Sequence, residues 1–595
     1  MRFKKIVGNN MLMLSYAWKY YKARLLGLFI ISIFSAVGAL GSVLFPKYAV
    51  DYLVTDQPFN KYVFLVLIFM FIFLMNIIIN NVFSIVVFQK GDNIIKGNVS
   101  RELMKKVPSI DMECYENPEF FDKYTRAVSE AENRVISVLN TVQALLSNLF
   151  TLGALITTMF ILSPITITIA IIGVIFPLWA NVKNNKLLLE FENSKTHSNR
   201  GVGYINRIFY LAQFAKEIRT TSVGGVLLKK HKRFCEKIDV IIKRFTPKIA
   251  KNAIIGSGLF TLFYNGVASI FIGYGIKEGN LTVGDFAALI AAINIVGNNL
   301  ISVFNIVPEC YKHSLFIENF KTILDYSPKI VNNDNSISLI TKTPHSFVIN
   351  NITFTYSNYD KPILKNLSFR ICAGEKVAFV GLNGAGKTTM VKLLERLYDP
   401  DKGEILIDSQ DLRQIKLESI HNSISTVYQD YQYYALTIAE NILMRETQGK
   451  EDEDIVWSSL ERSGLSEKVK NLPKGIYTEL TQEFDKEGVM LSGGEIQKLA
   501  LARMFASDSG IIILDEPSSA LDPIAEHEVH QQMIDASDGK TVILISHRLS
   551  TARMVDRIFL FKEGSILEEG SHNELMDLNG EYAHMFKLQA EKYLP

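Results

Sequence analysis

The chain has 595 residues, of which 48% are hydrophobic and 21% are charged, and its formal net charge is +2. This length predicts several domains, and the near-neutral charge excludes the bulk basic field typical of nucleic-acid-binding proteins. The four cysteines, Cys114, Cys235, Cys310 and Cys372, lie far apart and form no C-x-x-C pair. A zinc site and a disulfide framework are therefore not expected, and a reducing compartment fits.

Long apolar runs dominate the first half of the chain. The first run follows a short basic segment, is too long for the core of a signal peptide, and leaves no room for a further domain before it. Five more runs follow, and none of these five contains Asp, Glu, Lys or Arg. A span needs about 20 apolar residues, so the sequence predicts six transmembrane helices. They are residues 25–48, 62–88, 136–162, 165–182, 254–276 and 286–307.

The charges around these runs predict the orientation. Two long loops, after the second and fourth runs, carry many lysines and arginines, whereas the other connections are short. Positive loops face the cytoplasm, so both termini and both long loops are expected there. The five charge-free runs also argue against proton-driven transport, which uses intramembrane carboxylates.

Both long loops are expected to continue as helices from spans two to five. The first contains an aromatic cluster at residues 115–124 and the second another at residues 208–214. Each cluster fits two interpretations: packing inside a helical hairpin, or a short helix that docks on another domain. Both loops are longer than a simple connection between two helices needs to be.

The composition changes after Tyr326. Residues 327–345 contain Ser327-Pro328 and an Asn-rich stretch and are predicted to be a linker between a transmembrane domain, 1–326, and a domain at 346–595. In the last part, short apolar strands alternate with polar helices, which indicates an α/β fold.

The pattern G-x-x-x-x-G-K-T at residues 381–388 lies between an apolar strand, 377–380, and a helix-like run, 390–397. Strand, glycine-rich loop and helix together form a phosphate-binding P-loop. Lys387 is placed for the β- and γ-phosphates and the Thr388 hydroxyl for Mg²⁺. The residues expected to surround the phosphates are Gly381, Asn383, Gly384, Ala385, Gly386, Lys387, Thr388 and Thr389.

Two further motifs follow. The apolar strand 511–514 ends in Asp515, placed to hold Mg²⁺, and Glu516, placed to polarise the attacking water. Before it, Ser492, Gly493 and Gly494 precede a helix at 496–505. Alone, the first motif fits a strand-end turn and the second an ordinary helix cap. Because both occur in a domain that also carries a P-loop, both become candidates for a functional role.

With these motifs in place, residues 346–595 resemble the nucleotide-binding domain of ABC transporters. The resemblance includes Leu491–Glu495 as the signature, Gln429 and His547, and the stretch Ser519-Ala-Leu-Asp522. With six spans in front, the whole chain is similar to an exporter-type half transporter: a six-helix membrane domain followed by an α/β P-loop NTPase domain.

The resemblance implies roles. It implies that ATP and Mg²⁺ are the cofactors, that Tyr356 stacks on adenine, and that Gln429 contacts Mg²⁺ and senses the membrane domain. It implies that His547 holds the γ-phosphate. The signature with Asp522 would close over the P-loop of a second subunit. A homodimer is favoured because both halves of a site are present, and a heterodimer remains open.

The function implied is ATP-driven export across a bilayer, in a bacterial cell membrane, with the nucleotide-binding domain cytoplasmic. An ATP-gated channel on the same scaffold is the alternative, although the presence of Glu516 disfavours it, and import remains open. Six spans exclude a soluble ABC ATPase. The cargo is not identified: drug, lipid and peptide exporters share these motifs, and residues 115–122 resemble bacterial peptide exporters only slightly.

Two departures and one polar face complete the prediction. Residues 481–488 keep little of the Gly-Glu-x-Gly segment of many exporters, and the signature ends in Glu495 where Gln is frequent. Asn294, Asn298 and Asn305 share one face of the sixth span, as Asn76 and Asn80 do in the second. These amides are either polar contacts between helices or the lining of an uncharged cavity for an amphipathic cargo.

Overall fold

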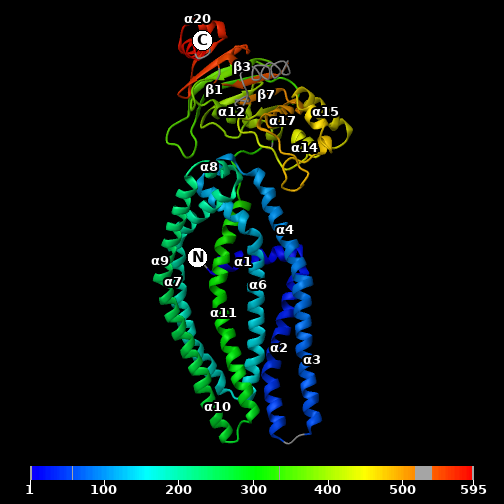
Figure 1. The fold of residues 1–595 in the computed structure, drawn as a ribbon, viewed down its shortest axis with the longest axis vertical. Coiled ribbons are helices and arrows are strands. Elements are labelled where there is room, and N and C mark those ends of the chain that lie inside the picture. Colours follow the sequence, from blue (N-terminus) through cyan, green and yellow to red (C-terminus); the bar gives the residue numbers. More distant parts are fainter. Residues whose placement is uncertain (1–2, 56–57, 334, 516–538, 548, 592–595) are drawn as a thin grey trace. The chain divides into compact units, whose positions relative to one another are not determined.

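A computed structural model describes residues 3–55, 58–333, 335–515, 539–547 and 549–591. The chain divides into two compact units (Figure 1). The first consists of Met1–Pro108 and Lys123–Asp325, and the second of Ser109–Asp122 and Tyr326–Pro595. The short segment 109–122 from the first long loop therefore belongs to the second unit. Each unit is described by itself.

The first unit is helical. In the described residues, six helical stretches are long and apolar enough to cross a membrane, and they contain the six predicted spans. The α-helices are α1 (Phe3–Tyr20), α2 (Lys22–Val54), α3 (Phe59–Val82), α4 (Gln89–Lys106), α6 (Pro118–Leu162), α7 (Ile165–Tyr210), α8 (Ala215–Thr220), α9 (Val223–Thr261), α10 (Ala268–Lys277) and α11 (Val283–Leu324).

The helices continue well beyond the apolar runs, as the sequence predicted. Two π-helical segments, Phe83–Phe88 and Leu262–Val267, join α3 to α4 and α9 to α10 without a break in the helical path. Such π-segments are single-turn insertions in α-helices. The second aromatic cluster lies at the end of α7 and in a 3₁₀ turn, Ala212–Phe214; its docking remains a prediction.

Tyr264 organises the core of this unit. Its side chain is fully buried, and its hydroxyl donates a 2.7 Å hydrogen bond to the carbonyl of Ala170 in α7. A Cβ at Gly173 of α7 would lie 2.4 Å from Cε2 of this ring, and a Cβ at Gly297 of α11 would lie 2.3 Å from the Tyr264 hydroxyl oxygen. Two glycines therefore let α7 and α11 close around one tyrosine, because small residues allow helices in membranes to approach closely.

The second unit contains two sheets. A four-stranded antiparallel sheet has the order β2-β1-β4-β5, and a six-stranded sheet has the order β10-β9-β3-β8-β7-β6. The strands are β1 (Phe347–Phe354), β2 (Leu364–Ile371), β3 (Lys376–Val380), β4 (Lys402–Ile407), β5 (Gln410–Asp411), β6 (Ile424–Val427), β7 (Ile511–Asp515), β8 (Thr541–Ile545), β9 (Arg557–Lys562) and β10 (Ser565–Gly570).

Within the larger sheet, β9, β3, β8, β7 and β6 are parallel, and β10 pairs with β9 in the antiparallel direction. Strands β7 and β8 are buried at every residue, as parallel strands covered on both faces must be. The three strands that the sequence predicted are β3, β7 and β8. Parallel pairing brings their carboxyl ends to one edge of the sheet.

The helices of the second unit are short. The α-helices described in this unit are α5 (Met112–Glu116), α12 (Lys387–Leu394), α13 (Leu417–Ser423), α14 (Ile438–Leu443), α15 (Lys450–Arg462), α16 (Ser466–Lys470), α17 (Gly493–Ala506), α19 (Leu549–Ala552), α20 (His572–Asp577) and α21 (Glu581–Glu591). Capping boxes at Thr437, Ser492 and Ser571 start α14, α17 and α20, and each satisfies two backbone donors of the helix end.

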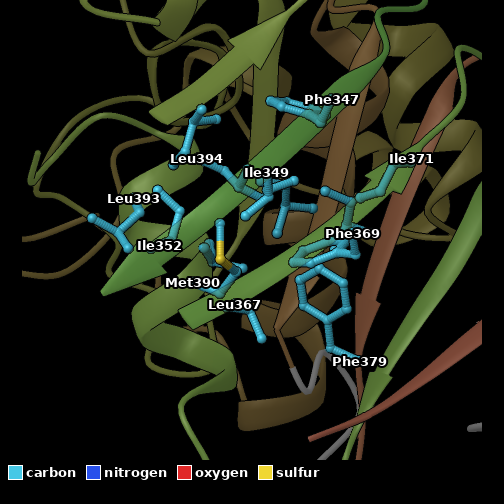
Figure 2. Packing of buried hydrophobic residues seen from close by; sticks show 14 of the residues in the cluster. Phe347, Ile349, Ile352, Leu367, Phe369, Ile371, Phe379, Met390, Leu393 and Leu394 are labelled. Atoms are coloured by element: carbon cyan, nitrogen blue, oxygen red, sulfur yellow. The ribbon is translucent and has the colours of Figure 1, made fainter. Parts of the chain in front are cut away.

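The core of this unit fixes the position of α12. Figure 2 shows side chains from β1, β2 and β3 meeting those of α12 in one apolar cluster. Met390, Leu393 and Leu394 of α12 are fully buried in it. Full burial of one such side chain contributes roughly 1.5–3 kcal/mol. The helix that begins directly after the glycine-rich loop is therefore held rigidly between the two sheets.

Candidate nucleotide-binding site

The glycine-rich loop adopts a conformation that its glycines make possible. Gly381 has φ 142° and Gly386 has φ 104°, in the region that side chains rarely occupy. A Cβ at Gly381 would lie 2.3 Å from the carbonyl oxygen of Phe561, and one at Gly386 would lie 2.6 Å from Leu364 Cδ2. Gly384 has φ 81° and open space around it. The three glycines thus allow a loop backbone that other residues would strain or obstruct.

Lys387 lies at the first position of α12 and is 6% exposed. Its Nζ donates hydrogen bonds to the carbonyl oxygens of Gly381, at 2.8 Å, and Leu382, at 3.1 Å. The side chain therefore folds back across the loop and places its ammonium beside the backbone N–H groups of the helix end. Both the helix dipole and this charge favour a phosphate here.

The two residues predicted to hold Mg²⁺ from facing elements meet. Thr388 Oγ1 of α12 donates to Asp515 Oδ2 at the end of β7, at 3.4 Å. Asp515 is 6% exposed. A hydroxyl and a carboxylate oxygen at this separation are the hard oxygen ligands that Mg²⁺ prefers, so the residues present fit this ion.

Gln429 and His547 are placed at the same edge of the sheet. Val427 pairs with Leu514, and Asp515 pairs with Ile545, in parallel registers. Gln429 follows β6 by two residues and His547 follows β8 by two residues, and both are exposed. Glu516, Ser519 and Asp522 lie outside the described residues.

Tyr356 follows β1 and contacts the P-loop helix. Its hydroxyl donates to Thr389 Oγ1 at 3.2 Å. Its ring packs edge-on against Phe354 and Tyr398, with centroids 5.0 and 5.4 Å away. The ring therefore lies beside the start of α12 and has packing partners of its own.

Ser492 is the N-cap of α17. Its Oγ accepts the Glu495 N–H at 3.4 Å, and the Glu495 carboxylate accepts the Ser492 N–H at 2.8 Å. These hydrogen bonds hold the pKa of Glu495 below its usual value. A Cβ on Gly493 or Gly494 would meet no atom within 4 Å. The signature is a capped helix end with open space above its glycines, so the cap and the phosphate-site interpretations are compatible.

The atypical segment before the signature, residues 481–488, consists of bends and turns held by close packing and ion pairs. Gly488 is packed so closely that a Cβ would lie 1.8 Å from the carbonyl oxygen of Thr481. Lys474 forms ion pairs with Asp485, at 2.8 Å, and Glu487, at 3.3 Å. The Lys474 ammonium holds the pKa of Asp485 below its usual value.

The segment 109–122 contacts residues around the site, which supports the docking interpretation of the first aromatic cluster. Glu116 pairs with Lys392 of α12 at 3.1 Å, and its carbonyl oxygen accepts a 2.8 Å hydrogen bond from Asn358. The ring of Phe120 lies 5.5 Å from that of Tyr326. Lys392 Nζ also lies 5.2 Å from the ring of Tyr356. Sequence reasoning missed Glu116 and Lys392, because their pairing joins positions far apart in the chain.

A buried carboxylate below the site was also missed. Glu395, directly after α12, is 4% exposed. Its Oε1 accepts hydrogen bonds from Thr426 Oγ1, at 2.5 Å, and from the Tyr428 hydroxyl, at 3.0 Å. Its Oε2 is buried and has no hydrogen-bond partner among the described residues. Burial raises the pKa of Glu395. The sequence signal that could have identified Glu395 is its position in an apolar helical pattern, because a glutamate is almost never fully buried unless it is paired.

The chain is similar to several known proteins. Residues 364–519 match the family model described as ABC transporter. The subtilin transport ATP-binding protein SpaT of Bacillus subtilis is 28% identical over 80% of this chain and 77% of its own length. The ATP-dependent lipid A-core flippase of Syntrophus aciditrophicus is 33% identical over 60% of this chain, and the match spans 59% of the flippase.

A third curated relative, the mitochondrial iron-sulfur clusters transporter atm1 of Aspergillus fumigatus, is 35% identical over 57% of this chain and 46% of its own length. The chain thus matches about half to three-quarters of the length of these relatives. The structure of a bacterial Atm1-family ABC exporter with ATP bound has a TM-score of 0.72 and 24% identity, and it covers 96% of this chain and 98% of that one. At this identity the likeness shows the fold, and the fold covers both units.

The P-loop geometry, the family match over residues 364–519 and the shared fold lead to one conclusion: the chain carries an ABC transporter ATPase domain and has the architecture of an exporter-type half transporter, in which a six-helix membrane domain is fused to that ATPase domain.

Proposed function

We propose that this protein is an ATP-driven exporter that moves an amphipathic cargo across a membrane by alternating access. The observation that carries the proposal is the P-loop with Lys387 folded across it, in a chain whose described residues also include six apolar helices long enough to cross a membrane. Closure of two nucleotide-binding domains and its reversal are a rigid-body switch between two states.

ATP would bind with its phosphates on the N–H groups of residues 381–389 and with its adenine beside Tyr356. Thr388, Asp515 and Gln429 would hold Mg²⁺, which neutralises charge on the β- and γ-phosphates when bound. Lys387 would exchange its carbonyl partners for phosphate oxygens. Glu516 would orient and polarise the attacking water, and His547 would donate a hydrogen bond to the γ-phosphate.

A second copy of the chain would complete each site. Ser492, Gly493 and Gly494 form an exposed, positively polarised helix end, and the same chain carries a complete P-loop. Two copies arranged head to tail would give two equivalent sites, each with a P-loop from one copy and a signature and Asp522 from the other. The homodimer is therefore the simplest working unit.

The cargo proposal rests on the relatives and on the spans. SpaT is named for subtilin transport, whereas the flippase is named for lipid A-core. Five charge-free spans suit a cargo with few fixed charges, so we propose an amphipathic peptide or lipid. The membrane would be a bacterial cell membrane, with the nucleotide-binding domains in the cytoplasm.

The test is transport by purified protein in sealed vesicles whose nucleotide-binding domains face outward. ATP should drive a fluorescent amphipathic peptide or lipid into the lumen, and Lys387→Ala should abolish this, because it removes the phosphate's charge partner. An ATP-induced ion current without cargo accumulation would show a channel instead. Absence of ATP hydrolysis in the wild-type protein, over the whole cargo panel, would contradict the exporter assignment.

A further inference from the structure

The antiparallel pair formed by α7 and α9 carries a set of exposed cations at one level. The buried amide of Asn252 in α9 donates a 3.0 Å hydrogen bond to Asn184 Oδ1 in α7, and Asn184 Nδ2 donates to the Ile249 carbonyl at 3.3 Å. These two hydrogen bonds fix the register of the helices. Residues within one turn of Asn184 and of Asn252 therefore lie at the same height along the pair.

The same height is where the charge-free stretches of both helices end. On α7 the first charged residue after residue 164 is Lys183, and on α9 the last charged residue before the stretch 252–276 is Lys251. Lys183 and Lys251 each directly adjoin one of the two hydrogen-bonded asparagines. The edge of the apolar band, and hence the membrane boundary, is thereby placed at this level.

Four cations gather there: Lys183 and Lys186 on α7, and Lys248 and Lys251 on α9. All four are exposed. The nearest acids on the two helices are Glu190, four residues after Lys186, and Asp239, nine residues before Lys248. In the part of the chain that the structure describes, none of the four forms an ion pair with a carboxylate.

An aromatic side chain marks the same boundary. Trp179 is 48% exposed, and Lys183 Nζ lies 4.8 Å from its ring centroid. Tryptophan is enriched where headgroups begin. On the neighbouring α11, Asn305 accepts a 3.3 Å hydrogen bond from Asn181 of α7, and the nearest acid of α11 on the charged side is Glu309, one turn further. The net charge of the level stays strongly positive.

We propose that this set of four cations, the boundary cations, binds the headgroups of anionic phospholipids. A phosphodiester supplies the charge that the unpaired ammonium and guanidinium groups lack, and the acyl chains lie along the exposed apolar surface beside Trp179. Each basic group near an anionic membrane surface strengthens binding by about fivefold in affinity. The proposal goes beyond the proposed function and rests on it only in placing α7 and α9 in a membrane.

The test titrates dansyl-labelled phosphatidylglycerol into the purified full chain in zwitterionic detergent, without ATP, and records energy transfer from tryptophan. Dansyl-labelled phosphatidylcholine is the headgroup control. We expect saturable transfer with phosphatidylglycerol only, weakened by salt. The quadruple variant Lys183→Gln, Lys186→Gln, Lys248→Gln and Lys251→Gln should lower the apparent affinity at least tenfold.

A matched control removes four exposed positive charges of α9 that lie away from the boundary: Lys229→Gln, Lys230→Gln, Lys232→Gln and Lys237→Gln. This variant should bind phosphatidylglycerol within about twofold of the wild type. Equal losses in the two variants, or equal binding of the two lipids by the wild type, would overturn the proposal. Both variants should keep the wild-type melting temperature and basal ATPase activity. Because binding is read without ATP, a protein that binds the lipid but transports nothing would refute the proposed function and leave this site intact.

Discussion

The Tyr428 hydroxyl donates a 3.0 Å hydrogen bond to the Glu395 carboxylate. Glu395 lies directly behind the P-loop helix, and Tyr428 directly precedes Gln429. Thr426 donates to the same carboxylate oxygen at 2.5 Å. One buried carboxylate thus joins the helix that holds the phosphates to the strand end that presents Gln429, and it is placed to position Gln429 without contacting nucleotide.

Removal of this acceptor should disturb both stability and Mg²⁺ use. In Glu395→Leu, the hydroxyls of Thr426 and Tyr428 lose their partner, which costs about 1–3 kcal/mol. We expect a lower melting temperature and, in the folded protein, a higher Mg²⁺ concentration for half-maximal ATPase activity. Glu395→Gln keeps the acceptor oxygen and should restore the Mg²⁺ requirement. If Leu and Gln variants show the same wild-type Mg²⁺ dependence, Glu395 does not position Gln429.

The same carboxyl should make stability depend on pH. Burial raises the pKa of Glu395 above its ordinary 4.5, so its protonated form is the one that the fold favours. Its stabilising contribution is complete below pH 4.5 and is lost as pH rises through the raised pKa. Gln is neutral at every pH. The melting temperature of Glu395→Gln relative to the wild type should therefore rise between pH 5 and pH 8.

A difference in melting temperature between Glu395→Gln and the wild type that stays constant across this pH range would show that Glu395 is ionised throughout.

Glu516→Gln should bind ATP and hydrolyse it far more slowly. Glu516 follows Asp515, whose carboxylate contacts Thr388 in the P-loop helix, and loss of a positioned base costs roughly 10²–10⁴-fold in rate. Turnover and nucleotide retention should be measured on the same sample, with Lys387→Ala as the variant that loses binding. Wild-type turnover in Glu516→Gln would refute its role as the base.

Substitutions at Tyr356 should separate adenine stacking from packing. Tyr356→Trp keeps an aromatic face and should keep the apparent KM for ATP near the wild-type value, whereas Tyr356→Ala should raise it severalfold. Tyr356→Phe removes only the hydrogen bond to Thr389 and serves as the control. An equal rise in the apparent KM for Tyr356→Ala and Tyr356→Trp would mean that Tyr356 acts through its packing against Phe354 and Tyr398 rather than by stacking on adenine.

Local signals predicted much of this structure. The P-loop, the Ser492 cap and strands β3, β7 and β8 each depend on a few consecutive residues, whose backbone preferences and apolar pattern are visible in the sequence. The pairs Glu395–Tyr428 and Glu116–Lys392 join distant positions, so nothing local announces them. The antiparallel sheet of β1, β2, β4 and β5 was missed for the same reason, because its pairing is set by tertiary packing.

The asparagines of the spans divide into two groups in the structure. Asn76 of α3 donates to the Phe34 carbonyl of α2, and Asn80 donates to Asn76 at 2.8 Å. A Cβ at Gly38 would lie 2.8 Å from the Asn76 amide nitrogen, so α2 is shaped to receive this side chain. Asn76 therefore acts as a polar contact between two helices, worth about 0.6 kcal/mol, and Asn80 hydrogen-bonds to it from the same helix.

The α11 face is different, and it gives the sharpest test of the cargo path. Asn294 donates to its own helix at Ile290 and Asn305 pairs with Asn181. Asn298 is exposed, and its side chain has no hydrogen-bond partner among the described residues. If Asn298 lines an uncharged cavity, Asn298→Leu should leave melting temperature and basal ATPase activity intact and abolish stimulation by amphipathic peptides. Asn76→Leu, the matched change at a packed asparagine, should lower the melting temperature and leave stimulation of the folded protein intact. The reverse pattern would place the cargo path away from Asn298.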